Sequence, residues 1–409
     1  MTLPASLAID AAARRVKLDP RDPTFFQDPY PAYEAIRAAC PVFFWADYGH
    51  WCALGHADVS ALLRDRRFGR QILHVMTREQ LGWPEPPERM AAWQAVEDRS
   101  LLALEPPVHT RLRGLVNRAF VSRAIERLAA PIAGLAVACA RKMRAEGQHD
   151  LIEGFATPIP VAVIAELLGA PGEMAAQLLD WSHKMVAMYQ FGVTRAIEDA
   201  AAGAARDFSR FLRSLIAERR RAPRDDLISQ LIAASDGAGK LDEDELVATC
   251  ILLLNAGHEA TVQSIGNGVR AMLESGVGAA RDGEALVEEI LRFDAPLHMF
   301  TRFALEEAQV GDVNFKQGEV IGLLLGAANR DPARFADPTG FDPARADNPH
   351  VSFGAGVHFC VGAPLARMEM RIALPILWRE LPGLRLAEAP KVKDAYHFHG
   401  LEALRVAWS

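Results

Sequence analysis

The sequence predicts a mainly α-helical protein with small β sheets, and three observations support this. Apolar residues recur at helical spacing through most of the chain between about residues 57 and 295. One helical pattern, from Asp242 to about Ser275, is so long and so apolar that it must lie at the centre of the molecule. Segments with β-type patterns are short and lie outside this helical region.

All 409 residues are expected to form a single domain, residues 1–409. The composition is ordinary for a globular protein, and no linker, repeat or low-complexity run divides the chain. The net charge of −7 does not indicate nucleic-acid binding. Because Asp10, Arg14 and Arg15 interrupt the N-terminal segment, we expect neither a signal peptide nor a membrane anchor, and we expect a cytoplasmic protein.

The first expected element is a hairpin, because segments 41–46 and 51–55 flank a turn at residues 47–50. Helical periodicity then predicts helices over residues 57–65, 107–120, 122–145, 159–168, 174–189, 195–220 and 226–235. The long helix should begin at a capping pair, Asp242 and Glu245. At about 1.5 Å per residue it would measure roughly 50 Å.

The C-terminal third is predicted to mix helices with short strands. A helix over 284–293 should end before Pro296, since the residue before a proline disfavours helix. Strands are expected at 303–312 and 319–325. An irregular stretch then leads to a final helix over 363–380.

Of the five cysteines, only Cys360 has unusual neighbours. The five are far apart, odd in number and without a CxxC pair, so neither a zinc site nor a disulfide framework is expected. Residues 353–362 contain three glycines, which indicates tight turns and close backbone approach. Pro364 fits the first turn of a helix, so Cys360 should lie at a helix N-terminus, where a thiolate is favoured.

This segment resembles the FGxGxHxCxG cysteine-ligand loop of the cytochrome P450 superfamily at every fixed position, including Phe353 and Gly354. The resemblance, to the soluble bacterial type, extends over nearly the whole chain. It implies the cytochrome P450 fold, with heme b between the long central helix and the loop, and with the Cys360 thiolate as the iron ligand. A cysteine in an arbitrary glycine-rich turn would more often be a buried structural residue.

Glu289 and Arg292 lie at i and i+3 of a predicted helix, a spacing that usually makes a solvated surface pair. The resemblance implies instead a structural network that includes Arg345. It also implies that His109, Arg113, Arg302 and His358 bind the haem propionates, for which charge-assisted hydrogen bonds are suited. Each of these alone is equally compatible with an ordinary surface charge.

The middle of the long helix resembles the family's AGx(D/E)T segment. Ala256 and Gly257 match the groove where O2 binds, and Glu259 matches the acid that helps to relay protons. The threonine position is Ala260, and Thr261 is turned away by about 100°. A helix threonine commonly bonds its own backbone. Our hypothesis is that a substrate hydroxyl or an ordered water supplies the missing donor.

The resemblance implies a monooxygenase that uses O2 as co-substrate on a small, largely apolar molecule. No flavin- or nucleotide-binding segment is seen, so electrons should come from a ferredoxin and its NAD(P)H-dependent reductase. A peroxide-driven enzyme, a non-oxygenating isomerase or dehydratase, and a non-enzymatic haem protein remain alternatives. Positions expected to line the substrate pocket, each also compatible with core packing, are Leu252, Asn255, Leu297, Met299 and Phe300.

Overall fold

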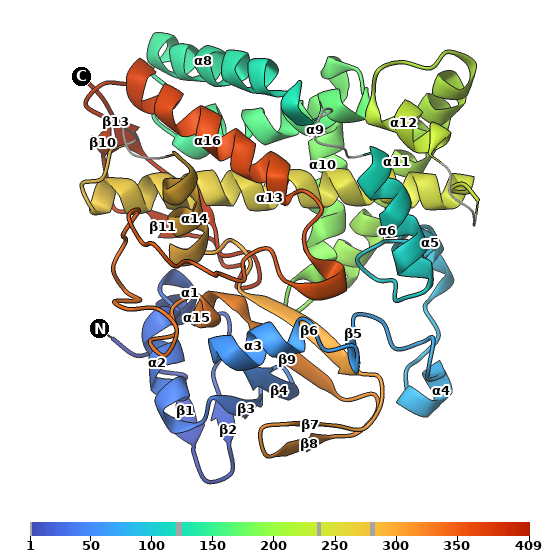
Figure 1. Cartoon of the computed structure of the whole chain (residues 1–409), viewed down its shortest axis with the longest axis vertical. Helices are drawn as coiled ribbons and strands as arrows, with labels where there is room; N and C mark the ends of the chain where they lie inside the picture. The colour runs from blue at the N-terminus through green and yellow to red at the C-terminus, as the bar shows by residue number, and fades with distance from the viewer. Residues whose placement is uncertain (1, 120–124, 235–238, 279–282) are drawn as a thin grey trace.

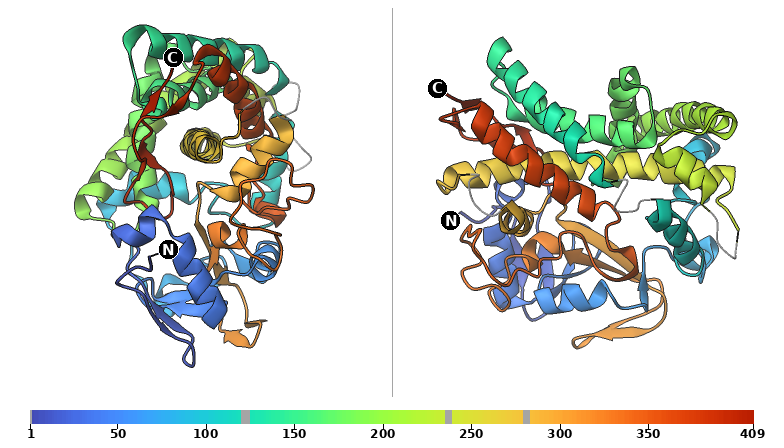
Figure 2. Two further views of the ribbon diagram at one scale, coloured as in Figure 1. Left: turned by 90° about the vertical axis from the view of Figure 1, so that its left-hand side faces the viewer. Right: turned by 45° about the horizontal axis from the view of Figure 1, so that its top comes forward.

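The computed structural model describes residues 2–119, 125–234, 239–278 and 283–409. One long helix, α13 (Glu243–Glu274), crosses the molecule, and other helices surround it (Figure 1). Seen end-on, α13 lies inside a ring of other elements (Figure 2). The predicted central helix is therefore confirmed.

The N-terminus of α13 has the predicted capping box. The Glu245 backbone N–H donates to the Asp242 side chain at 2.7 Å, and the Asp242 N–H donates to the Glu245 carboxylate at 3.0 Å. Such reciprocal bonds satisfy helix N–H groups that have no partner within the helix. The helix is buried on most sides, which explains why its sequence is apolar nearly all round.

Most surrounding helices lie where periodicity predicts them: α3 (His56–Leu62), α6 (Val108–Ala119), α9 (Pro158–Leu168), α10 (Ala175–Val186), α11 (Arg195–Arg221), α12 (Leu227–Ala233), α14 (Gly283–Phe293) and α16 (Ala363–Glu380). The helix predicted over 122–145 is shorter, because α8 spans Ala129–Glu146. Residues 120 and 122–124 of the predicted helices lie outside the described residues. The pattern did not indicate α1 (Pro23–Gln27), α2 (Tyr30–Ala39), α4 (Arg78–Leu81), α5 (Ala91–Glu97) and α15 (Leu325–Ala328).

The largest sheet has the strand order β1-β2-β3-β4-β9-β6-β5 and lies on the opposite side of α13 from α8 (Figure 1). The predicted hairpin is confirmed as the antiparallel pair β3 and β4. The strands of this sheet are β1 (Ala8–Asp10), β2 (Arg15–Lys17), β3 (Val42–Trp45), β4 (His50–Ala53), β5 (Phe68–Gly69), β6 (Met299–Ala304) and β9 (Val320–Leu324).

The strand predicted over 303–312 is wrong. The chain leaves the large sheet at Ala304, and β7 (Ala308–Val310) forms a separate hairpin with β8 (Val313–Phe315). Gly311, with φ of 58°, makes the turn of this hairpin in a left-handed conformation that glycine adopts without strain. The prediction was wrong because the apolar pattern did not show that the chain leaves one sheet and enters another through residues 305–307.

Near the C-terminus, two small sheets carry the chain back to α13. They pair β10 (Arg385–Leu386) with β13 (Val406–Ala407), and β11 (Lys391–Val392) with β12 (Leu401–Ala403). The Leu401 N–H donates to the Gln263 side chain of α13 at 2.9 Å. This places the loop between β11 and β12 beside the middle of the central helix.

Within the described ranges, no helix has an apolar stretch long enough to cross a membrane.

Candidate active site

Cys360 lies in a loop whose shape its glycines permit. The Cys360 N–H donates to the Phe353 carbonyl at 2.9 Å, which closes the loop. Gly354 and Gly356 both have left-handed φ angles, of 66° and 68°. A Cβ at Gly356 would lie 2.5 Å from the Leu63 carbonyl oxygen, so only glycine fits there.

Burial dominates the electrostatics of Cys360 and raises the pKa of its thiol. The Gly362 and Ala363 N–H groups at the start of α16, and the cations of Arg113 and Arg367, act in the opposite direction without outweighing burial. The N–H groups at the helix N-terminus therefore act in the predicted direction, but burial outweighs them. A coordinated metal ion deprotonates such a thiol, so this buried sulfur suits a metal ligand.

A cationic cluster lies beside the cysteine loop. His109 and Arg302 are buried, and the ring centroids of His109 and His358 are 4.4 Å apart. Arg113 contributes to the electrostatic field at both His109 and Cys360. The structure thus brings together the four residues predicted to hold the propionates. It adds Arg70, which follows β5 and lies close enough to lower the pKa of Arg302.

These cations have too few anionic partners. Burial, then the neighbouring Arg70, lowers the pKa of Arg302 to about 9, although Glu105 opposes this. Burial also lowers the pKa of His109 to about 4, and its Nδ1 has no hydrogen-bond partner among the described residues. Glu105 is the acid of this cluster, 3.1 Å from His358 Nε2. A group with two carboxylates fits this surplus of buried donors.

On the α13 side, Ala256 is exposed in the middle of an otherwise buried helix. Gly257 faces α9, where an added Cβ would lie 3.3 Å from the Ile164 side chain. The Thr261 hydroxyl lies 3.5 Å from the Gly257 carbonyl oxygen, the backbone contact expected of a helix threonine. Ala260, which is partly buried, offers no hydroxyl.

The Glu259 carboxylate points towards α10 and the loop between β11 and β12. Its Oε2 lies 3.3 Å from His183 Nε2, and its Oε1 lies 3.4 Å from Lys393 Nζ. Burial alone would raise the pKa of Glu259, but the His183 hydrogen bond and the Lys393 charge lower it to about 2. At neutral pH this carboxylate is therefore an anion, connected to the surface through His183.

The positions predicted to line the pocket divide into two groups. Leu252 and Leu297 are partly buried, and Asn255 donates to Met185 Sδ of α10 at 3.8 Å while its carbonyl oxygen has no partner among the described residues. Met299 is a correction, because it is 3% exposed and packs in the core beneath the large sheet.

Phe300 points to the opposite face of β6 from Met299, as successive strand residues do. Its ring lies 4.0 Å from the position of a Cβ at Gly354, so it contacts the cysteine loop. Its partly exposed side chain therefore lies beside the segment that carries Cys360.

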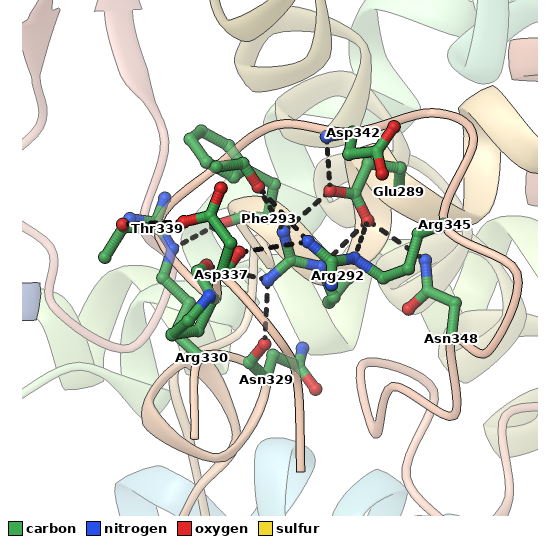
Figure 3. Close-up of polar contacts among 12 residues, drawn as sticks. Glu289, Arg292, Phe293, Asn329, Arg330, Asp337, Thr339, Asp342, Arg345 and Asn348 are labelled. Atoms are coloured by element: carbon green, nitrogen blue, oxygen red, sulfur yellow. Dashed lines mark hydrogen bonds and ion pairs between the residues drawn. The ribbon is translucent and has the colours of Figure 1, made fainter. Parts of the chain in front are cut away.

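The Glu289 network is drawn in Figure 3. The Arg292 guanidinium donates to both Glu289 oxygens at 2.7 and 2.8 Å, and Arg345 Nε donates to Oε2 at 3.2 Å. The structure therefore unites the three predicted residues, with Glu289 and Arg292 fully buried. It adds the Asn348 amide, at 3.1 Å from Glu289 Oε2, and the Asp342 N–H, at 2.8 Å from Oε1.

This network holds the chain that leads into the cysteine loop. Asn348 is tied to Glu289, and the Ser352 hydroxyl donates to the Leu291 carbonyl of α14 at 2.6 Å. Phe353 follows directly and begins the loop. The buried ion pairs thereby fix the position from which Cys360 is presented.

Known proteins share this arrangement. The family described as Cytochrome P450 matches residues 284–382. The polyketide biosynthesis cytochrome P450 PksS of Bacillus subtilis (strain 168) is 34% identical over 97% of this chain and 99% of its own length. The vitamin D(3) 25-hydroxylase of Pseudonocardia autotrophica is 37% identical over 89% of each. The solved structure of P450BioI with hexadec-9Z-enoic acid ligated acyl carrier protein gives a TM-score of 0.88 at 33% identity, covering 95% of this chain and 99% of that one.

Proposed function

The chain belongs to the cytochrome P450 superfamily, and on that premise we propose that it transfers one oxygen atom from O2 to a small, largely apolar organic molecule, with electrons from a separate protein. It is a haem-thiolate monooxygenase, with haem iron as cofactor and O2 as co-substrate. The observation that carries the proposal is the partly buried Cys360 beside a cationic cluster in which Glu105 is too little acid for the basic groups present.

Residues on the cysteine side would hold the cofactor. Cys360 Sγ would be the iron ligand, and the Gly362 and Ala363 N–H groups hydrogen-bond to this sulfur and help to hold its charge. The propionates would accept hydrogen bonds from the cationic cluster, which we define as Arg70, His109, Arg113, Arg302 and His358. The bound haem supplies the activation of O2.

Residues on the α13 side would control water and protons. His183 is half exposed, and its Nε2 can pass a proton to Glu259 Oε2 over 3.3 Å. The Thr261 hydroxyl is engaged by its own helix backbone and Ala260 has none, so neither offers a free donor at the oxygen site. A water or a hydroxyl of the substrate would therefore supply the last hydrogen bond.

An apolar substrate is supported by the side chains of the segments expected to contact it. The family resemblance implies substrate contacts around residues 71–94 and 182–191, and in these segments Val75, Trp83 and Phe191 are large apolar residues that remain exposed. The side-chain oxygen of Asn255 has no partner among the described residues, so it could accept a hydrogen bond from a substrate hydroxyl. Small-molecule sites commonly combine such an apolar wall with a few polar groups.

A ferredoxin with its NAD(P)H-dependent reductase is the proposed electron source. The sequence contains no segment that resembles a flavin- or nucleotide-binding unit, and the chain matches PksS over 99% of the length of that protein. These observations support a separate protein as the electron donor.

Turnover with isotopically labelled O2 tests the proposal. The holoenzyme would be screened against apolar compounds in matched pairs, with and without a hydroxyl, and against free fatty acids. We expect ferredoxin, reductase and NAD(P)H to give a product carrying one atom from O2. Product formed with hydrogen peroxide alone, and none with the ferredoxin system, would contradict the proposal and favour a peroxide-driven enzyme. Unlabelled, rearranged product would favour an isomerase.

A further inference from the structure

We propose that His183, His258 and Glu259 form a binding site for a divalent transition-metal ion of the zinc class. The ligand atoms of these residues, two imidazole nitrogens and one carboxylate oxygen, all lie within 4.8 Å of one another. Two of the residues are neighbours on α13, and the third comes from α10. Imidazole and carboxylate groups are the ligands that zinc, copper and nickel ions take in proteins.

The distances between the ligand atoms suit a tetrahedral ion. His183 Nε2 lies 3.3 Å from Glu259 Oε2, and His258 Nε2 lies 3.9 Å from the same oxygen. Ligands at about 2.0–2.1 Å from a tetrahedral zinc ion are separated by roughly 3.4 Å. Both separations from the Glu259 oxygen are thus within about half an ångström of this value, and the ligand atoms of the two histidines lie within 4.8 Å of each other. Three protein ligands leave a fourth position of the ion for water.

The His258 ring is oriented so that its Nε2 can bind a metal ion. Its Nδ1 lies 2.9 Å from the Leu254 carbonyl oxygen, which can only accept, so Nδ1 carries the proton. Nε2 is then the nitrogen whose lone pair is available to bind an ion. The side chain is 1% exposed, and Nε2 has no hydrogen-bond partner among the described residues. A metal ion would satisfy this buried atom, and a backbone carbonyl on the other nitrogen is the usual orienting contact of a metal-bound histidine.

The two carboxylate oxygens of Glu259 have different partners: Oε2 faces the histidines, and Oε1 contacts Gln263 and Lys393. The Gln263 amide donates to Oε1 at 3.2 Å, and Lys393 Nζ lies 3.4 Å from the same oxygen. Oε2 is left facing the two imidazoles. The exposed edge of His183, whose side chain is 53% accessible, gives an ion a route from solvent to this oxygen.

A second group of acid and histidine side chains has similar distances but is not available to bind a metal ion. Asp294, His298 and His399 also lie within ligand distance of one another. However, Asp294 already accepts from Arg270 at 2.6 Å and from Tyr30 at 2.9 Å, and all three residues are fully buried. Neither an unused carboxylate oxygen nor a route from solvent is present there.

An ion at the proposed site would hold Glu259 Oε2 and His183 Nε2 together as ligands. It would then prevent the proton transfer between these two atoms. This consequence rests on the proposed function, whereas the binding of the ion does not. Zinc is thus expected to lower the yield of product per electron consumed while leaving the reduction of the haem unchanged.

Calorimetric titration of Zn²⁺ into the ferric holoenzyme, prepared without an affinity tag, tests the site itself. We expect one equivalent to bind, and His183→Asn to weaken that binding at least tenfold, since even loss of an orienting contact costs 10–100-fold. Lys393→Gln removes a cation beside the carboxylate and should strengthen binding. His56→Asn is the matched control, because His56 lies on α3 and its Nε2 contacts only the Pro349 carbonyl.

Equal binding by the unaltered protein and His183→Asn, or no binding by either, would overturn the proposal. So would an equal affinity for Mg²⁺, which prefers oxygen ligands and would not require the imidazoles. Because His183 is a surface residue, its replacement leaves the fold intact. Heat is measured without turnover, so failure of this proposal is distinguishable from failure of the oxygen-transfer proposal.

Discussion

The cysteine side and the α13 side of the haem site hold their polar groups in different ways. On the cysteine side, Glu289 and Arg292 are 0% exposed, and every oxygen of Glu289 is engaged. On the α13 side, the partners of Glu259 reach solvent, with 53% of the His183 side chain and 39% of Lys393 accessible. The side that carries Cys360 is thus fixed by buried ion pairs, whereas the side that carries Glu259 stays open to the surface.

The largest effect expected is on the cysteine side. Glu289→Gln leaves two buried guanidinium groups without a carboxylate and should destabilise the fold by about 3–5 kcal/mol. Unfolding in denaturant, followed by fluorescence, measures this. Glu288→Gln is the control, because its carboxylate is 30% exposed and pairs with Arg367 and His350, so the expected loss is smaller, about 1 kcal/mol. Equal losses in both variants would show that the buried network has no special role.

The cationic cluster lies between the two sides and should govern the retention of haem. Arg302→Gln removes a charge-assisted hydrogen bond of about 1.5–3 kcal/mol, so haem should bind roughly 10–100-fold more weakly. Transfer of haem to an acceptor protein measures the change. Arg67→Gln, which alters an exposed pair with Asp65, should leave the transfer rate as it was. A normal rate in Arg302→Gln would remove this residue from the haem site.

A pH dependence should mark the α13 side. The pKa of Glu259 is lowered to about 2 in the folded protein from an ordinary value of 4.5, so its ionised form stabilises the fold above about pH 4.5. That stabilisation is lost as the pH falls towards 2. The destabilisation caused by Glu259→Gln should thus be about 1 kcal/mol smaller at pH 4 than at pH 7.

Denaturant unfolding at the two pH values measures this difference, with the exposed Glu388→Gln as the control. A penalty that is the same at both pH values would show that the Glu259 carboxylate is not held by His183 and Lys393 in solution. The open character of the α13 side would then need another explanation.

The smallest effect is expected at the position of the absent threonine. Ala260→Thr should leave the product formed per electron nearly unchanged, because a water or a substrate hydroxyl already supplies the hydrogen bond. Thr261→Val should be similarly mild, since its hydroxyl is near only the Gly257 carbonyl. A large gain in Ala260→Thr would show that no such donor is present.

Elements with strong local signals could be predicted from the sequence. The capping box at Asp242 places the start of α13, and Pro364 with the glycine-rich loop places α16 at Ala363. The cysteine loop is partly local, because Gly354 and Gly356 adopt left-handed φ angles that favour glycine, although Gly356 must also fit against the distant Leu63 carbonyl. In these places the chemistry depends on neighbours along the chain.

Residues brought from distant segments could not be predicted. Arg70, His183 and Lys393 belong to no recognisable pattern, and their importance comes from the partners that tertiary packing places beside them. Met299 was assigned to the pocket from the family resemblance alone, because the sequence did not predict that this residue begins β6 with its side chain in the core. The burial that raises the pKa of Cys360 likewise depends on the whole fold, so the sequence could indicate only the opposing effect of the helix N-terminus.

The absorption spectrum of the ferrous, carbon monoxide-bound protein tests the central claim most directly. Cys360→Ser, compared with the unaltered protein and with Cys139→Ser, separates the proposed ligand from a cysteine on α8. The account predicts that the band typical of thiolate ligation disappears in Cys360→Ser and is retained in Cys139→Ser. A thiolate band that persists without Cys360 would contradict the assignment of the iron ligand and the active site built around it.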